Sequence, residues 1–202
     1  MMKTVKLIDI ATVYTGEPIR NKISPNEHGD VKIVQMKDIS DDGELDWNGV
    51  IRMQFTNREK RQGKTKYLQN NDVLFKARGK HNYAADVQQC SEDTIISPHL
   101  FLIRPHDTNK IISGFLAWQI NQLTAQQYFH TEAEGSRTIG IRKPVLENLE
   151  IKLPHMDKQK QVLTAYKLWL EQKKVLQTMT AQHEVYKDAI ARHFLDDAKD
   201  NL

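Results

Sequence analysis

The sequence predicts an α+β fold in which a small, mostly antiparallel sheet domain with one packed helix precedes a single long C-terminal helix. Five or so short runs rich in Val, Ile, Leu and Phe, separated by polar turns, indicate the sheet. Residues 109–129 repeat apolar side chains at helical spacing, and residues 157–197 contain neither Gly nor Pro. We therefore expect a globular domain at 1–156, a long helix at 157–197 and a tail at 198–202.

Local patterns predict the elements in order. Residues 4–14 have the spacing of a short amphipathic helix that stops at Gly16. The segments expected to be extended are 30–40, 45–55, 72–77, 94–97 and 99–105. After the helix at 109–129, the pattern predicts a strand at 137–141, a helical turn at 144–149 and a strand at 150–154, where Pro154 ends the globular part.

Composition excludes several classes of protein. The 39% hydrophobic content supports a packed core, and no apolar run approaches the ~20 residues that a membrane span needs. Lys3, Lys6 and Asp9 interrupt the N-terminal segment, so a signal peptide is not expected. The single cysteine, Cys90, excludes an internal disulfide and fits a reducing cytosol, so we expect a cytoplasmic protein.

The positive charge of the chain is concentrated in one segment. Residues 51–82 contain nine Lys or Arg against two acids, a local charge of +7 in a chain whose net charge is +3. A concentrated basic block is expected where a protein meets a polyanion such as nucleic acid. A solvated Lys/Arg-rich loop is the alternative explanation.

Two glycine–lysine pairs resemble the end of a phosphate-binding P-loop, but neither completes it. Arg58 stands where the first glycine is required for Gly63-Lys64-Thr65, and Leu74 stands there for Gly79-Lys80. Without that glycine the backbone cannot wrap the phosphates, so no nucleotide cofactor is expected.

One pair of residues resembles a catalytic metal site. Glu150 and Lys152 have the Glu-x-Lys form of metal-dependent nucleases, in which a carboxylate binds Mg²⁺ beside a lysine. The acid required on a neighbouring strand has no convincing candidate, since Asp107 and Glu147 lack the context. The eight histidines show no zinc spacing. We expect no metal and no enzyme, and keep the nuclease as an alternative.

The long helix carries a seam that repeats every seven residues. The seam residues expected to pair with another helix are Val162, Tyr166, Trp169, Leu176, Met179, His183, Tyr186 and Ile190. A helix of some forty residues is ~60 Å long, more than the domain needs to cover its own core. We therefore favour a coiled coil over a helix that folds back on the domain. Polar seam residues such as Gln172 and His183 weaken the seam but can set its register.

Four segments together resemble a known family. They are KLIDIATVYTG at 6–16, YLQNNDVLFKARG at 67–79, HLFLIRP at 99–105 and SRTIGIRKPVLENLEIKLPHMDKQKQV at 136–162. In this order they resemble the target recognition domain, and then the long helix, of the DNA specificity subunit of type I restriction–modification enzymes. The strongest part is 139–162, where a strand ends in Leu-Pro and Gln159 follows the proline by five residues. His155 and Lys158 depart from the double proline and Glu-Gln often found there.

The resemblance implies a half-sized, non-catalytic specificity subunit. Family members usually carry two recognition domains and two long helices, whereas this chain has one of each. Two copies could pack their helices antiparallel as a homodimer and read a bipartite, palindromic DNA site. The subunit would then position methyltransferase subunits and, through them, the restriction nuclease. A coiled-coil adaptor that binds protein instead of DNA is a further alternative.

The candidate DNA contacts follow from the basic block and the family. Those for phosphate or base contacts are Arg58, Lys60, Arg61, Lys64, Lys66, Lys76, Arg78 and Lys80. His81 and Asn82, after Gly79, are candidates for base edges, and Ser136 and Arg137 join them from the EGSR turn. We expect Gly79 to take a positive φ, because Arg and Lys resist that conformation.

Overall fold

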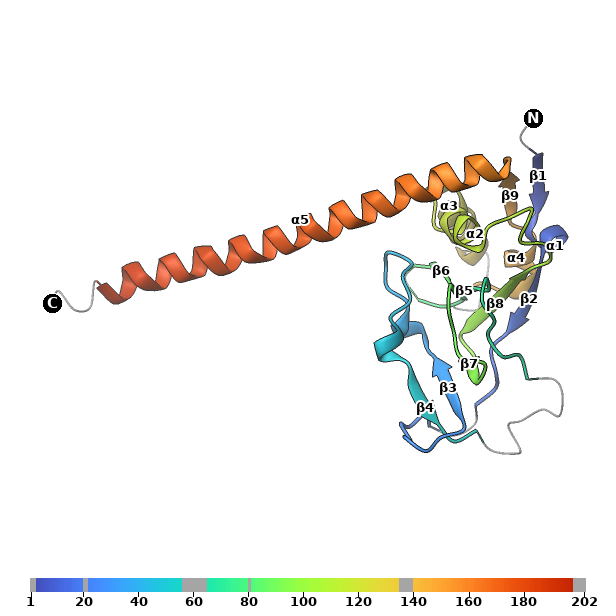
Figure 1. Cartoon of the computed structure of the whole chain (residues 1–202), viewed down its shortest axis with the longest axis horizontal. Helices are drawn as coiled ribbons and strands as arrows, with labels where there is room; N and C mark the ends of the chain where they lie inside the picture. Colours follow the sequence, from blue (N-terminus) through green and yellow to red (C-terminus); the bar gives the residue numbers. More distant parts are fainter. Residues whose placement is uncertain (1–2, 20–21, 56–64, 80, 135–139, 198–202) are drawn as a thin grey trace. The chain divides into compact units, whose positions relative to one another are not determined.

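Strand β5 (Val73–Lys76) lies inside a four-stranded antiparallel sheet that organises the globular part of the molecule. The computed structural model describes residues 3–19, 22–55, 65–79, 81–134 and 140–197 (Figure 1). Chain contacts divide it into two compact units, Met1–Gln161 and Val162–Leu202, which are treated separately below. The first unit contains all of the sheets.

The central sheet runs in the order β2 (Ala11–Thr15), β8 (Leu100–Pro105), β5 and β6 (Ala84–Asp86). Its strand β5 is covered on both faces, which explains its continuous apolar run. Leu74 belongs to a cluster that includes Val34, whereas Phe75 packs against Phe129 of a covering helix with ring centroids 5.1 Å apart. Burial on both sides removes the alternation that a half-exposed strand shows.

A second sheet supports the first. It has the order β4 (Ile51–Met53), β3 (Val31–Val34) and β7 (Thr94–Ile96), with β3 antiparallel to β4 but parallel to β7. The short 3₁₀ helices η1 (Met36–Asp38) and η2 (Trp47–Gly49) lie between β3 and β4 in the chain. The sheets are thus mostly antiparallel, as expected, with one parallel pairing.

The helix predicted at residues 4–14 is wrong. The segment forms β1 (Lys3–Lys6), a single turn α1 (Leu7–Ile10) and β2. The turn is closed locally, because the backbone N–H of Lys6 donates to the Asp9 carboxylate at 3.0 Å. On either side, β1 pairs with β9 (Glu150–Leu153) and β2 pairs with β8. Strand pairing with segments about 150 residues away for β1 and about 90 residues away for β2 overrides the local helical spacing.

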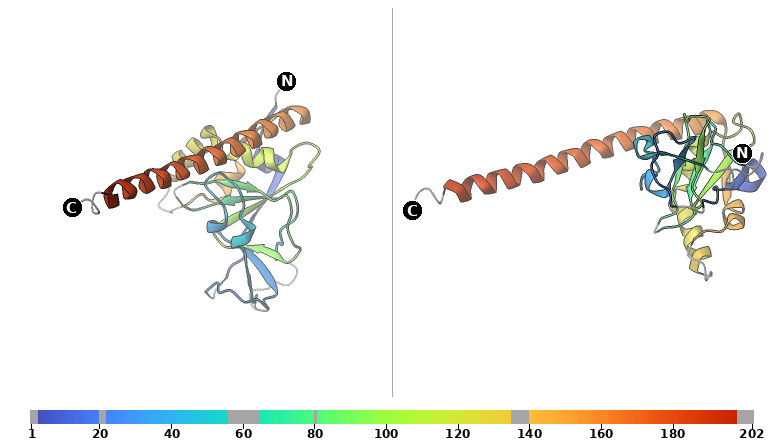
Figure 2. Two further views of the ribbon diagram at one scale, coloured as in Figure 1. Left: turned by 60° about the vertical axis from the view of Figure 1, so that its left-hand side comes forward. Right: turned by 90° about the horizontal axis from the view of Figure 1, so that it is seen from below.

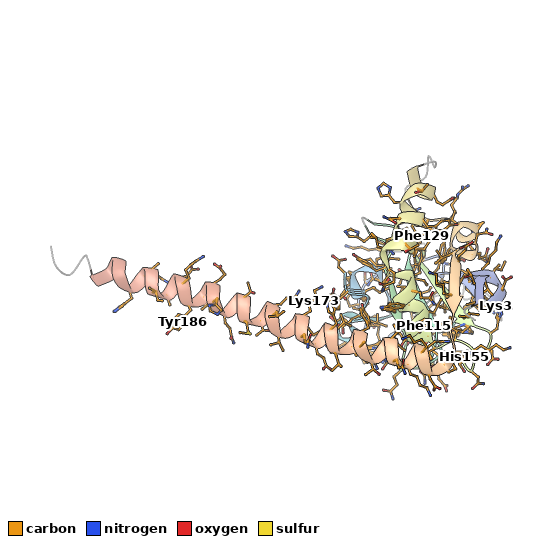
Figure 3. All side chains as sticks on the ribbon, turned by 90° about the horizontal axis from the view of Figure 1, so that it is seen from above. Lys3, Phe115, Phe129, His155, Lys173 and Tyr186 are labelled. Atoms are coloured by element: carbon orange, nitrogen blue, oxygen red, sulfur yellow. The ribbon has the colours of Figure 1, made fainter. Side chains whose placement is uncertain are left out.

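The single helix predicted at residues 109–129 is also wrong, because it is two helices. They are α2 (Ser113–Ile120) and α3 (Leu123–Glu134). The break is at Asn121, whose side chain accepts a hydrogen bond from the Ala84 N–H at 2.7 Å and donates to the Ala84 carbonyl at 2.8 Å. Asn121 therefore completes the outer edge of β6 in place of another strand. In Figure 3 the labelled Phe115 and Phe129 lie on these helices.

Smaller differences concern the remaining expected elements. Strand β6 was not predicted, and part of the segment 45–55 is the 3₁₀ helix η2. Gly140 and Ile141 are not in a strand, and the rest of the strand expected at 137–141 lies outside the described residues. The helical turn α4 (Lys143–Glu147) and β9 are confirmed.

Helix α5 (Met156–Asp197) confirms the predicted long helix and is continuous in both views of Figure 2. Its first turn belongs to the globular unit, because Gln159 is fully buried there. The Gln159 side chain accepts a hydrogen bond from the Ile112 N–H at 3.0 Å and donates to the carbonyls of Lys110 and Pro154 at 2.9 and 3.0 Å. In the described part of the chain, no helix is long and apolar enough to span a membrane.

Replacing Gln159 by Ala is expected to lower the free energy of unfolding of the chain by about 2–4 kcal/mol. The change leaves three backbone groups without their partner, and each costs roughly 1–3 kcal/mol where it stays buried but less where water replaces the lost partner, as at the exposed Lys110. Urea denaturation measures the effect, with Gln161→Ala, an exposed glutamine of the same helix, as the matched control. Equal stabilities of the two variants would contradict this role of Gln159.

Candidate nucleic-acid interface

The start of β5 is anchored by a buried ion pair. Asp72 is 1% exposed, and its carboxylate accepts two hydrogen bonds from Arg104 of β8, from Nε at 2.8 Å and from an Nη at 2.7 Å. The same carboxylate accepts the backbone N–H of Gln69 at 2.8 Å, and Arg104 also donates to the carbonyl of Tyr67 at 2.9 Å. The hydrogen bond to Asp72 raises the pKa of Arg104, so the guanidinium is held in its charged form.

The end of β5 leads into a loop that is held from several sides. The N–H of Ala77 donates to the carbonyl of His99 at 3.1 Å, and its own carbonyl accepts the N–H of Ile141 at 2.7 Å. The Asn82 side chain donates to the Lys76 carbonyl at 2.9 Å and so closes the loop on itself. We name residues 77–82 the β5–β6 loop; it leaves the sheet at a position that these bonds determine.

Two glycines permit this geometry. Gly79 has φ = +112°, as the sequence predicted. Gly140 has φ = +137°, and a Cβ there would lie 2.7 Å from the Ala77 carbonyl oxygen and 2.9 Å from Cγ of Arg78. The segment that follows Ser136 and Arg137 in the sequence therefore reaches the β5–β6 loop directly beside Arg78.

The structure separates the described cations of the basic block into different environments. Arg78 is exposed on the β5–β6 loop. Lys76 instead has a side chain only 13% exposed, which donates to the Ile39 carbonyl at 3.2 Å and lies 3.7 Å from the Asp41 carboxylate. The ammonium of Lys66 lies 5.4 Å from the centre of the Tyr14 ring.

Arg52, a further member of the basic block, also interacts within the domain. It donates to the Asp93 carboxylate at 2.5 Å and to the Gly29 carbonyl at 2.9 Å. The full charge of residues 51–82 therefore overstates the charge available to a partner. The other candidates, Arg58, Lys60, Arg61, Lys64, Lys80, Ser136 and Arg137, lie outside the described residues.

A groove of about 750 Å³, lined by both polar and apolar side chains, lies between the β5–β6 loop and α3. The loop contributes Gly79, His81 and Asn82, and α3 contributes polar side chains that include Gln127 and His130. His81 is exposed and stacks on Tyr83 with ring centroids 5.3 Å apart. Sequence reasoning did not select the α3 residues, although their spacing of three along a helix places them on one face.

The alternative nuclease pair occupies a different place. Glu150 and Lys152 lie on β9, which pairs with β1, and they line a pocket of about 500 Å³ with Trp118 and Tyr128. Burial, with the nearby charge of Glu132, raises the pKa of Tyr128. Among the residues that the structure describes, no group of three His, Cys, Asp or Glu could hold a metal ion. The geometry therefore adds no support to metal-dependent cleavage.

The second unit exposes large apolar side chains. Trp169, Leu176, Met179, Tyr186 and Ile190 are 47–72% exposed, and His183 is exposed among them. Val162 and Tyr166 are half-buried, and the Tyr166 ring stacks on Trp169 at 5.8 Å. Figure 3 labels Lys173, whose ammonium lies 5.4 Å from the centre of the Trp169 ring, and Tyr186 further along α5.

The sequence matches one family model, described as the type I restriction modification DNA specificity domain, over residues 1–167. No curated protein sequence matches the chain.

Solved structures show the same fold. A chain from a structure described as the basis of complex assembly and conformational transition of the type I R-M system gives a TM-score of 0.62 at 19% identity, covering 91% of this chain and 42% of that one. The HsdS subunit from Thermoanaerobacter tengcongensis gives a TM-score of 0.58 at 18% sequence identity, and the match covers 87% of this chain and 39% of that one. The S subunit of a type I restriction-modification system from M. genitalium gives a TM-score of 0.51 at 13% identity, and the match covers 88% of this chain and 41% of that one. The chain thus spans about two fifths of each.

Exchanging Asp72 for Ala is expected to lower the free energy of unfolding by about 2–4 kcal/mol, because a largely buried guanidinium is left without its counter-charge. Glu184→Ala, which removes an exposed partner of Lys187 in α5, should change it by less than about 1 kcal/mol. The double variant Asp72→Leu/Arg104→Met should recover part of the loss, since no charge remains buried alone. If the double variant loses as much stability in urea denaturation as Asp72→Leu and Arg104→Met lose singly and added together, the two residues are not coupled.

Proposed function

The chain belongs to the family of type I restriction modification DNA specificity domains, and we propose that it is a sequence-specific DNA-binding subunit without catalytic activity of its own. The observation that carries the proposal is the β5–β6 loop, which presents exposed Arg78 and His81 beside a groove lined in part by polar side chains. Cations on such a surface bind phosphates and fix position, while amide and imidazole groups can read base edges. A subunit that binds DNA would act in the cytoplasm.

Hydrogen bonds at the two ends of the β5–β6 loop support this function. The backbone of Ala77 is bonded to His99 and Ile141, and the Asn82 side chain donates to the Lys76 carbonyl. A loop whose ends are held loses less conformational entropy on binding than a loop with free ends. We propose that Lys80, Ser136 and Arg137 contact the duplex together with Arg78, because Gly140, three residues after Arg137 in the sequence, lies beside Arg78.

The long helix supplies the second part of the proposal. Two copies would pair through the seam of α5 and hold two identical recognition domains, so that the dimer reads a bipartite palindromic site. The dimer would position methyltransferase subunits and, through them, a restriction subunit. What supports this is the row of exposed apolar side chains on α5, an arrangement that a helix exposed to water on every side does not need.

Removing the charges of Arg78 and Lys80 together by substitution with Ala is expected to weaken binding to target DNA at least about tenfold and to flatten its salt dependence. Loss of two phosphate contacts reduces the slope of log K against log salt concentration by about 2. Fluorescence anisotropy with a labelled duplex measures both quantities. The matched control is Lys110→Ala/Arg192→Ala, which removes the same charge at two exposed positions that are not part of the loop.

Unchanged DNA binding by the Arg78/Lys80 variant would show that the loop is not part of the interface. A binding constant of the unaltered protein that does not depend on salt would favour the protein-binding adaptor instead.

Leu176→Glu is expected to dissociate the dimer, raising its dissociation constant at least about a hundredfold, because it places a carboxylate in an apolar seam. Val185→Glu is the matched control, since Val185 is 67% exposed against 63% for Leu176 but lies off the seam. Analytical ultracentrifugation should give 23.4 kDa for the first variant at micromolar concentration and twice that mass for the second. A monomeric unaltered protein would contradict homodimerisation.

A further inference from the structure

The exposed apolar residues of α5 form a stripe that is wider than a two-position seam. With Val162 at position a of a seven-residue repeat, the seam residues occupy positions a and d, except Tyr166, which is at position e, and position g adds Leu168 and Val175. Among the described residues of the second unit, Val185 is the single large exposed apolar side chain outside a, d and g. The additional exposed apolar side chains therefore lie on one side of the seam, the side of position g.

The two flanks of the stripe differ in charge. Between residues 161 and 189 the g flank is uncharged, with Leu168, Val175, Gln182 and Ala189, whereas the e flank carries Lys173 and Lys187 beside Tyr166 and Thr180. In a parallel pair of helices each g position lies beside an e position of the partner, so Leu168 would lie beside a lysine. In an antiparallel pair the g rows lie beside each other, and the lysines remain on the solvated side. The charge pattern thus favours an antiparallel pair of identical helices.

The polar residues of the seam select one alignment. We propose that two copies of α5 pair antiparallel in the register in which Gln172 of each copy faces His183 of the other. The a residue of one copy then faces a d residue of the other throughout: Trp169 faces Tyr186, Leu176 faces Met179, Ala165 faces Ile190 and Val162 faces His193. The inference rests on the homodimer in the proposed function and adds its register.

Hydrogen bonding explains why this register is preferred. An amide both donates and accepts, so Gln172 can bond either tautomer of the His183 ring. By two-fold symmetry the pair occurs twice, once on each side of the central Leu176 and Met179 layers. A polar pair within an apolar seam stabilises its own alignment mainly by penalising the others.

Alignments shifted by one seven-residue repeat in either direction leave Gln172 and His183 without each other. A shift of one seven-residue repeat in one direction places His183 opposite Ala165 and Gln172 opposite Leu176. The opposite shift places His183 opposite Met179 and Gln172 opposite Ile190. In both cases a polar group loses water without gaining a hydrogen bond, and each such group costs roughly 1–3 kcal/mol.

Disulfide cross-linking tests the register directly, in a Cys90→Ser background that removes the single native thiol. Ala165→Cys/Ile190→Cys is expected to give mostly covalent dimer of twice 23.4 kDa after oxidation. The two positions are about 37 Å apart along one helix, whereas a disulfide requires Cα atoms within about 7 Å, so the bond can form only between copies.

Three control variants report the competing alignments. Val162→Cys/Tyr186→Cys and Leu176→Cys/Tyr186→Cys report the two shifted registers, and Ile190→Cys alone reports a parallel pair. Little covalent dimer is expected from any of them. Efficient cross-linking of a control, or none of the Ala165/Ile190 variant, overturns the register.

A second measurement tests the polar pair itself. His183→Leu alone should weaken the dimer about tenfold, because Gln172 then faces an apolar side chain. Adding Gln172→Leu should restore association and allow the shifted cysteine pairs to cross-link. Equal effects of the single and double variants overturn the role of the pair.

DNA binding of the same preparations separates the register from the proposed function. If cross-linking fails while salt-dependent DNA binding is unaltered, the register alone is rejected. If the unaltered chain does not bind DNA, the proposed function is rejected.

Discussion

The Asp72–Arg104 ion pair links the beginning of β5 to the end of β8, and the geometry of the candidate interface depends on it. A carboxylate that is 1% exposed must have its charge and its lone pairs satisfied, and Arg104 together with the Gln69 N–H does both. A slip of β5 by one residue would break this pair and turn Leu74 and Phe75 to the opposite faces. The ion pair therefore helps to determine where the strand ends and, at that end, where the β5–β6 loop leaves the sheet.

Side-chain amides connect the irregular parts of the globular unit in the same way. Asn121 bonds both backbone groups of Ala84, and Gln119 bonds both backbone groups of Lys152, each taking the place of a neighbouring strand. Gln159 bonds three backbone groups around the start of α5. An amide carries a donor and an acceptor, so it can satisfy an edge that no further strand covers. This explains how several small sheets and short helices form one unit.

Helix α5 passes through two environments, because its first turn lies in the globular unit and the rest of the helix does not. Its first turn is bonded to the globular unit through a fully buried glutamine, while the apolar stripe beyond it is exposed. Apolar side chains at a regular seven-residue spacing stabilise the isolated helix little, since they gain burial only against a partner. The same helix thus ties its first turn into the globular unit and carries, beyond it, the apolar side chains on which the proposed dimer depends.

Periodicity and local composition by themselves determined the long helix, the buried strands β5 and β8, and the positive φ of Gly79, because each of these depends on a pattern within a few residues. The family resemblance likewise rested on short segments such as the junction at Gln159. Pairing between distant segments decided the rest. Much of the segment 4–14 forms strands because it pairs with β8 and β9. The helix expected at 109–129 is interrupted where the Asn121 side chain bonds Ala84. Lys76, which was expected to be a surface cation, donates to the Ile39 carbonyl instead. The groove beside α3 also exists through tertiary packing alone, since no local pattern brings a loop at 77–82 to a helix some forty residues later.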